Sequence, residues 1–180
     1  MKIQRYFMMC IEKIQIALHK PYMKTRIKKY RLDGVCIGEN CRIFTDLSFA
    51  EPYLVTIGNN VTISTNCNLI THDNSVIKFI NNATDVVGRV NIGNNCFIGA
   101  NSIILPGVTL ADGTIVGAGS VVCKSVSEPN QVIAGNPAKI IASTNKLQEK
   151  YENSCFDFRK LNKQERKIQI LSNEENLIVR

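Results

Sequence analysis

The sequence contains two histidines, His19 and His72, and only His72 stands in a context that suits acid–base chemistry. A neutral imidazole is a good proton acceptor near neutral pH because its ordinary pKa is about 6.5. His72 lies in the segment LITHD, where a regular aliphatic pattern ends and a loop begins, so its side chain can reach a cleft. Its alternative role is that of a plain surface residue. His19 lies in a strongly basic segment, where a solvated or core-capping role is expected.

Two carboxylates are candidates to assist His72. Asp73 follows it directly, but adjacent side chains of an extended strand point apart, so capping of the loop by an Asx turn is the alternative for Asp73. Glu51 precedes Pro52 in a second interruption of the aliphatic pattern. We expect Glu51 either to hold the imidazole ring or to bind hydroxyls of a substrate, with a solvated loop carboxylate as the alternative.

The seven cysteines are odd in number and form no CxxC pair, so neither a disulfide framework nor a zinc ribbon is expected. Cys41, Cys67 and Cys96 occupy a repeated small-residue position at which a thiol acts as a compact hydrophobe. Cys123 lies beside the aliphatic Val122, on the opposite face of the strand, and is the candidate for a reactive thiol. The sequence has no Walker loop, HExxH or calcium-loop motif, and no metal site is predicted.

The element that positions these side chains is a repeat of six residues in the middle of the chain. Aliphatic residues recur at this interval in three registers, and a small or β-branched residue stands two positions before each of them. The aliphatic positions are Ile37, Ile43, Ile57, Ile63, Leu69, Ile92, Ile98, Ile104, Leu110, Val116 and Val122. Both kinds of position are predicted to point inward. Glycine, asparagine and aspartate fill the corners, where left-handed backbone is needed at Asn59, Asn60, Asn94, Asn95, Asp112 and Gly113.

A helix cannot produce this pattern, since six residues advance it by about 600° and scatter the aliphatic side chains around its axis. Short flat strands joined by corners can, and three hexads then make one turn of a triangular prism of parallel strands. The predicted fold is therefore an all-β solenoid, a left-handed parallel β-helix, with an N-terminal helix and a helical C-terminal tail. The short, little-twisted strands permit this exception to the right-handed crossover rule.

The pattern divides the chain into residues 1–32, 33–142 and 143–180. Two interruptions fall inside the β-helix, a bulge at Phe44 to Leu54 and an external loop at 73–89. Insertions in a solenoid often build its binding face.

Charge is concentrated at the N-terminus, where Met1 to Leu32 has nine Lys or Arg residues against Glu12 alone. The β-helix region has five basic residues against eight acids, which disfavours a nucleic-acid partner. Residues 3, 7, 10, 11, 14 and 18 are apolar at helical spacing, so an amphipathic helix is predicted there, ending before Pro21. This helix either caps the end of the prism or attaches residues 1–31 to an anionic membrane. The charged C-terminal tail is assigned no chemistry.

No stretch approaches the ~20 apolar residues that a spanning helix needs, and the first 20 residues lack the features of a secretory signal. We therefore expect a cytoplasmic protein, with peripheral location at the inner face of the membrane if the basic segment attaches there.

The run from Val90 to Ile140, VNIGNNCFIGANSIILPGVTLADGTIVGAGSVVCKSVSEPNQVIAGNPAKI, resembles the hexapeptide-repeat acyltransferases that use acetyl-CoA. The histidine in LITHD before a protruding loop belongs to the same resemblance. The phrases EPYLVTIGNNVTIS and LITHDNSV look like the branch that acetylates sugars in capsular or other surface polysaccharide synthesis.

The resemblance implies a homotrimer with active sites between neighbouring prisms, His72 as the catalytic base and acetyl-CoA as acyl donor. Phe97, Ala100 and Ala118 match positions that line the coenzyme groove. Lys124 also matches a groove position, and Lys139 matches a basic position near the coenzyme phosphates. Phe97 stands where relatives often have Trp. The two lysines are fifteen residues apart, which is less than one turn of three hexads, so we expect them to share a neighbourhood away from His72.

The predicted function is acetyl-CoA-dependent O-acetylation of a sugar hydroxyl in a glycan or its precursor. Direct transfer is preferred to an acyl-enzyme on Cys123. One alternative is N-acetylation of an amino sugar on a nucleotide carrier, and the other is a non-catalytic β-helix that serves as a binding or scaffold protein. A serine acetyltransferase is disfavoured because the long helical N-terminal domain of that family is missing.

Overall fold

The structure is a computed structural model that describes residues 2–47 and 50–178. The chain divides into two compact units, Met1–Thr144 and Asn145–Arg180. The predicted N-terminal helix and the β-helix region therefore belong to one unit. Of the predicted bulge at Phe44 to Leu54, residues 48 and 49 lie outside the described part, as do residue 1 and residues 179–180.

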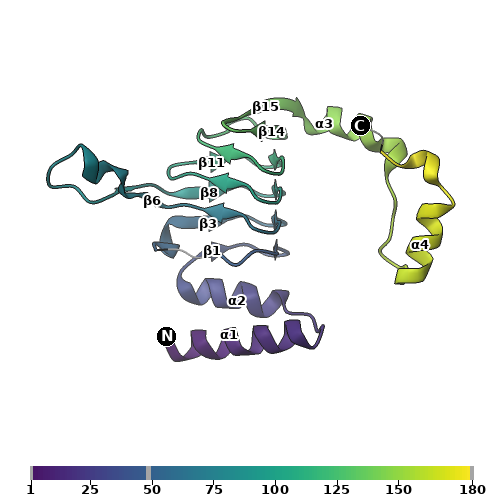
Figure 1. Cartoon of the computed structure of the whole chain (residues 1–180), viewed down its shortest axis with the longest axis horizontal. Helices are drawn as coiled ribbons and strands as arrows, with labels where there is room; N and C mark the ends of the chain where they lie inside the picture. The colour runs from purple at the N-terminus through teal and green to yellow at the C-terminus, as the bar shows by residue number, and fades with distance from the viewer. Residues whose placement is uncertain (1, 48–49, 179–180) are drawn as a thin grey trace. The chain divides into compact units, whose positions relative to one another are not determined.

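Short strands in the first unit stack into three separate sheets, and the chain visits the sheets in turn (Figure 1). The first sheet contains β1 (Cys36–Ile37), β3 (Val55–Ile57), β8 (Val90–Ile92) and β11 (Thr109–Leu110). The second contains β5 (Asn68–Leu69), β10 (Ile103–Ile104) and β13 (Val121–Val122). The third contains β2 (Arg42–Ile43), β4 (Thr62–Ile63), β9 (Phe97–Ile98), β12 (Ile115–Val116), β14 (Gln131–Gly135) and β15 (Ala138–Ser143).

All pairings in these three sheets are parallel except that of β14 with β15. Partners in successive turns lie eighteen residues apart where the repeat is regular, as in Ile103 with Val121 and Phe97 with Ile115. This offset confirms that three hexads make one turn. We refer to residues 36–143 as the coil.

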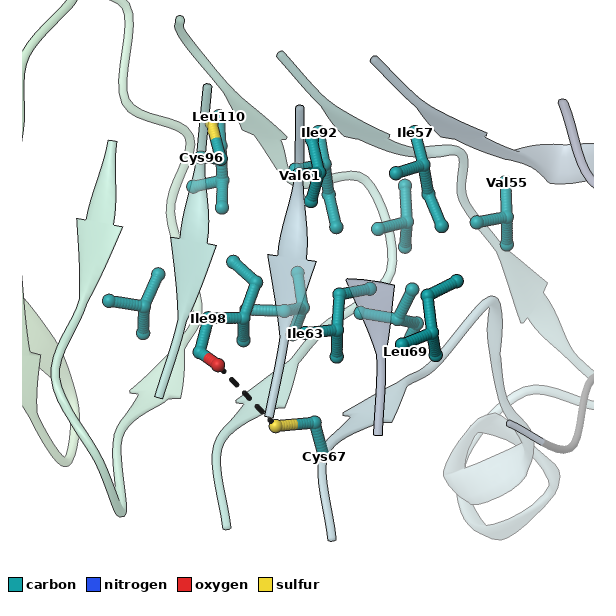
Figure 2. Close-up of a cluster of buried hydrophobic side chains, with 14 of the residues drawn as sticks. Val55, Ile57, Val61, Ile63, Cys67, Leu69, Ile92, Cys96, Ile98 and Leu110 are labelled. Carbon is teal, nitrogen blue, oxygen red and sulfur yellow. Dashed lines mark hydrogen bonds between the residues drawn. The ribbon is translucent and has the colours of Figure 1, made fainter. Parts of the chain in front are cut away.

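Inside the coil, both predicted inward positions are buried. The eleven aliphatic residues of the repeat, from Ile37 to Val122, have exposed fractions between 0 and 7%. The small residues two positions earlier, from Val35 to Ser120, are equally enclosed. Residues from all three sheets join one hydrophobic cluster, so the sheets enclose a single core. Figure 2 shows part of it, with the Cys67 thiol 4.0 Å from the Ile98 carbonyl oxygen.

The corners only partly follow the prediction. Asn60, Asn95 and Gly113 have positive φ as expected, but Asn59, Asn94 and Asp112 do not. The side chains of these three instead stack from turn to turn, and the Asp112 carboxylate accepts hydrogen bonds from Asn94. Asn40, Asn66 and Asn101 also have positive φ, between 56 and 60°.

At Gly58, which follows the buried Ile57, glycine is required because successive turns approach closely there. A Cβ on Gly58 would lie 2.8 Å from the backbone nitrogen of Asn94 in the next turn. Stacked turns with a spacing of ~4.8 Å leave no room for it.

The two interruptions build the surroundings of His72. The segment after β2 takes the place of a strand of the second sheet in the first turn, and ends in the 3₁₀ helix η1 (Pro52–Leu54). The external loop is an antiparallel hairpin of β6 (His72–Asp73) and β7 (Val86–Val87), with η2 (Asn74–Lys78) between them. Figure 1 shows this hairpin leaving the stack of strands.

Two helices precede the coil, α1 (Lys2–Ala17) and α2 (Met23–Asp33). The helix that covers the end of the coil is α2, whose Ile27 and Tyr30 belong to the core cluster. Tyr30 is 1% exposed, and its hydroxyl donates to Thr45 O and accepts from Leu47 N. The predicted helix at Ile3 to Leu18 packs on α2 instead (Figure 1).

The second unit contains most of α3 (Thr144–Tyr151), with η3 (Glu152–Ser154), α4 (Lys163–Leu171) and η4 (Glu174–Asn176). Asn162 caps α4 by accepting from the backbone N–H of Glu165, while the Glu165 carboxylate accepts from Asn162 N. This reciprocal capping box satisfies backbone N–H groups at the start of α4. In the described part of the chain, no helix is long and apolar enough to cross a membrane.

Candidate active site

His72 lies where the hairpin leaves the coil. Its backbone pairs with Val87 across the hairpin, and Gly88 N donates to Thr71 O at 2.8 Å. These bonds fix the base of the hairpin on both sides of the histidine. The His72 side chain is 39% exposed, so one edge of the ring is open to a substrate while the other packs on the protein.

The buried side of the ring faces Glu51. His72 Nδ1 lies 3.1 Å from Glu51 Oε2, and the same oxygen accepts a hydrogen bond of 2.6 Å from the Thr71 hydroxyl. Thr71 is 2% exposed, and the Glu51 side chain is 22% exposed. The three groups come from both interruptions of the repeat, which the coil brings together across twenty residues of sequence.

Glu51 is held in its ionised form. The hydrogen bond from Thr71 is the largest cause that lowers the pKa of the Glu51 carboxyl below its ordinary 4.5, and the His72 ring lowers it further against an opposing effect of partial burial. A carboxylate accepts only, so the ring must present N–H at Nδ1. Nε2 then carries the lone pair, and within residues 2–47 and 50–178 it has no hydrogen-bond partner.

The Asp73 carboxylate turns away from this pair. Its Oδ1 accepts from Ser75 N at 2.8 Å and caps η2, which is the Asx-type arrangement of the loop. The backbone N–H of Ser75 is also the largest cause that lowers the pKa of Asp73. Glu51, and not Asp73, makes the hydrogen bond to the histidine.

Thr71 was not among the residues selected from the sequence. Its hydroxyl fixes the glutamate that fixes the histidine, so it belongs to the same arrangement. The position of Thr71 directly before His72 in the segment THD is visible in the sequence. Its hydrogen-bond partner, Glu51, lies twenty residues away in the other interruption of the repeat.

The predicted groove residues Phe97, Ala100 and Ala118 gather at one edge of the coil. Phe97 points outward from β9 with 44% of its surface exposed. Ala100 and Ala118 occupy the next corner in successive turns, where Gly119 N donates to Ala100 O at 2.8 Å. Ala118 is exposed, and its short side chain leaves the backbone of this corner open.

The two predicted coenzyme lysines are placed by different sheets. Lys124 stands two residues after β13, as Thr71 stands two residues after β5, and β5, β10 and β13 stack in one sheet. Lys124 therefore lies at the same corner as His72, two turns further along the coil. Lys139 lies on β15 of the third sheet, where it pairs with Ala134 of β14. The expectation that the two lysines share a neighbourhood away from His72 stays a prediction.

The cysteines divide into buried and exposed groups. Burial raises the pKa of the Cys41, Cys67 and Cys96 thiols, each of which donates to a backbone carbonyl of the neighbouring turn. Cys123 is exposed, and its thiol donates to Val121 O at 3.6 Å. In the described ranges, no group of three or more His, Cys, Asp or Glu side chains is arranged to hold a metal ion.

Comparison with known proteins agrees with this architecture. Residues 89–124 match the family described as Bacterial transferase hexapeptide (six repeats). The chain is 45% identical over 149 residues to Protein CapG of Staphylococcus aureus, covering 80% of this chain and 86% of that protein. It is 33% identical to the putative colanic acid biosynthesis acetyltransferase WcaF of Escherichia coli (strain K12), covering 62% of this chain and 70% of that one.

Among solved structures, the chain is similar to a galactoside acetyltransferase in complex with coenzyme A. The TM-score is 0.54 at 26% identity, and the match covers 70% of this chain and 73% of the other. The stacked parallel strands, the repeat and these likenesses define a hexapeptide-repeat transferase. The chain belongs to this family and is an acetyltransferase.

Proposed function

We propose that this acetyltransferase moves the acetyl group of acetyl-CoA directly to a sugar hydroxyl in surface or capsular polysaccharide biosynthesis, with His72 as general base. The observation that carries the proposal is the contact of Nδ1 with the Glu51 carboxylate, which leaves Nε2 free to accept a proton. We also propose that the coil winds with the left-handed sense that the sequence predicts.

The chemistry needs few groups. Nε2 of His72 takes the proton of the acceptor hydroxyl as its oxygen attacks the thioester carbonyl, and the imidazolium then gives the proton to the departing thiolate. The negative charge of Glu51 stabilises the imidazolium while it exists, and Thr71 keeps that carboxylate in place. Acetyl-CoA supplies the activated acyl group. A backbone N–H is the natural donor to the developing oxyanion.

The similarity to a galactoside acetyltransferase supports a sugar acceptor, since a galactoside carries hydroxyl groups. The likeness to a protein named for colanic acid biosynthesis supports a polysaccharide context. Coenzyme A in the similar structure supports acetyl-CoA as the donor.

We further propose that the active site forms between neighbouring copies in a homotrimer. Phe97, Ala100 and Ala118 follow the third sheet, whereas His72 follows the second, so the base and the predicted groove lie at different corners of one coil. Packing of two coils side by side brings the corner of one against the face of the other. In this arrangement Lys124 and Lys139 bind the coenzyme as exposed cations.

The first test is turnover by the whole chain with acetyl-CoA and three kinds of acceptor: neutral sugars, free amino sugars and nucleotide-linked amino sugars. Free thiol release and product mass report the reaction. We expect acetylation of a neutral sugar. Transfer to amino sugars alone would contradict O-acetylation, and absence of turnover on all three would favour a non-catalytic protein.

The role of His72 is tested with His72→Asn, because the amide nitrogen of asparagine can still donate to Glu51 but cannot accept the proton. We expect kcat to fall by roughly 10² to 10⁴ fold with unchanged melting temperature. The matched control is His19→Asn, at an exposed position with a φ of 52°, which asparagine tolerates. A kcat for His72→Asn within threefold of the parent would contradict the assignment.

Direct transfer is tested with Cys123→Ser, the exposed thiol nearest in sequence to the groove positions. We expect most activity to remain. Loss of turnover together with an acetyl group trapped on the parent protein would show that a thiol carries the acyl group.

A further inference from the structure

Helix α1 buries a carboxylate, Glu12, and leaves apolar side chains on its opposite face exposed. Glu12 is 3% exposed and faces α2, where its carboxylate accepts hydrogen bonds from Arg26 and, at 2.7 Å, from Lys29. On the opposite side of α1, Ile3, Phe7 and Ile14 are 86, 62 and 58% exposed. A helix that only capped a hydrophobic core would bury such residues.

These three residues form one continuous stripe together with the exposed Cys10. Their spacing of four, three and four residues places them on one face of the helix. At 100° per residue, Glu12 lies on the far side of that face. We call Ile3, Phe7, Cys10 and Ile14 the α1 stripe.

The coil cannot cover the α1 stripe. Ile27 and Tyr30 of α2 already close the end of the coil, and α2 lies between α1 and β1 (Figure 1). The α1 stripe therefore faces outward at the end of the first unit.

The charge around the α1 stripe has one sign. Glu12 is the single acid among the first 32 residues, and it is enclosed by Arg26 and Lys29. Within the described residues, the exposed ammonium groups of Lys13, within α1, and Lys20, three residues after it, have no carboxylate at salt-bridge distance. A convex apolar stripe with free cations near it complements a deformable, negatively charged surface.

We propose that α1 binds the surface of an anionic lipid bilayer, with the α1 stripe in the interface and the lysines at the headgroups. The helix has sixteen residues, which is too short to span a bilayer and suits a position in the membrane plane. The pairing with α2 keeps the stripe exposed before binding. An acetyltransferase held in this way would act on acceptors at the membrane surface, a consequence that rests on the proposed function, whereas lipid binding itself does not.

The test is sedimentation of the full-length protein with vesicles of phosphatidylglycerol and phosphatidylcholine, compared with phosphatidylcholine alone. We expect binding to the anionic vesicles that weakens with added salt. The variant Ile3→Ser/Phe7→Ser/Ile14→Ser should lower the partition coefficient by about tenfold or more. The variant Lys13→Gln/Lys20→Gln should lower it by about fivefold per lysine.

The matched control is Ile168→Ser/Leu171→Ser on α4, whose side chains are 58 and 56% exposed, much like those of the α1 stripe. We expect this control to bind like the parent. Equal loss in the control, equal binding to neutral vesicles, or no binding by the parent would each overturn the proposal.

Light scattering of the same variants distinguishes a protein partner. We expect the serine variant of the α1 stripe to keep the molar mass and the melting temperature of the parent, because the replaced side chains are exposed. A fall in molar mass would show that the stripe is an interface between copies, and would overturn the proposal. All readouts are independent of turnover.

Discussion

A single carboxylate oxygen, Glu51 Oε2, joins the two residues on which the candidate base depends. It accepts from the buried Thr71 hydroxyl and contacts His72 Nδ1. The Thr71 hydroxyl therefore orients the Glu51 carboxylate, and this carboxylate in turn orients the imidazole ring.

We predict that Thr71→Val lowers kcat by about three- to tenfold, the usual worth of one hydrogen bond, and leaves KM for both substrates unchanged. The two side chains have nearly the same shape, so the fold should persist. Loss of the hydroxyl also raises the pKa of Glu51 towards its ordinary 4.5, because the strongest cause of its lowering is removed. Thr71→Ser, which keeps the hydroxyl, should restore kcat. An unchanged kcat in Thr71→Val, or a loss that Thr71→Ser does not restore, would argue against a positioning role.

The sequence alone could indicate His72 and Glu51 because both fall where the six-residue period breaks. It could not indicate Thr71, since a threonine in a strand is ordinary and its partner is known only when both interruptions are placed. Asp73 is a candidate because it directly follows His72. However, neighbouring side chains of an extended strand point apart, and the Asp73 carboxylate accepts a hydrogen bond from Ser75 N instead.

At the scale of elements, the charged helix α2 is the one that closes the core. Its sequence, MKTRIKKYRLD, is typical of a solvated segment, and its burial becomes possible because Glu12 of α1, together with Asp46, pairs with two of its cations, Arg26 and Lys29. Burial by itself raises the pKa of Glu12, but the hydrogen bonds from Lys29 and Arg26 outweigh it, and the net pKa is lowered below 4.5. The two helices therefore fold as a pair.

We predict that Glu12→Gln lowers the free energy of unfolding by about 3 kcal/mol at pH 7, since it leaves the buried Arg26 and Lys29 with only the exposed carboxylate of Asp46 as counter-charge. The contribution of a carboxyl with a lowered pKa is complete above its unfolded value of about 4.5 and is lost as the pH falls through the folded value. The difference between Glu12→Gln and the parent should shrink below pH 4.5. Chemical denaturation at several pH values measures this, with Glu39→Gln, an exposed partner of Arg31, as control. A difference that stays constant down to low pH would contradict an ionic origin.

Most of the coil was predictable, whereas its ends were not. The period, the inward positions and the three-hexad turn follow from the spacing of Ile98, Ile104 and Leu110, because a parallel stack repeats one steric requirement many times. The corners at Asn66 and Asn101 were missed because left-handed backbone there depends on the turn geometry, and asparagine type alone does not reveal it. The ends lack the repeat, so no periodic signal assigns their partners.

At the scale of the whole molecule, the separation of His72 from the predicted groove residues bears on assembly. In the proposed homotrimer, each chain would present the candidate base at one corner and the predicted groove at another, and a closed ring of copies would supply both to every site.

We predict that His72→Asn and Ala118→Trp, each inactive as a pure protein, regain activity when their subunits are mixed. Tryptophan at the exposed Ala118 fills the predicted groove, while His72→Asn leaves that groove intact. In a random cyclic trimer about a quarter of the sites combine an intact base with an intact groove, so about a quarter of parental kcat is expected. Mixing His72→Asn with the double variant His72→Asn/Ala118→Trp is the control and should give nothing. If the first mixture has only the summed activity of its components, each site lies within one chain.

The antiparallel pairing of β14 with β15 has a consequence for growth of the stack. Every earlier turn offers the next one a parallel template, in the way that a filament end accepts another identical unit. On the third sheet β15 runs the other way and offers no template in the same direction, and at the opposite end α2 replaces a strand altogether. On the third sheet the parallel ladder therefore stops at β14, and at the opposite end α2 covers the core, so both ends disfavour the addition of a further parallel strand from another copy.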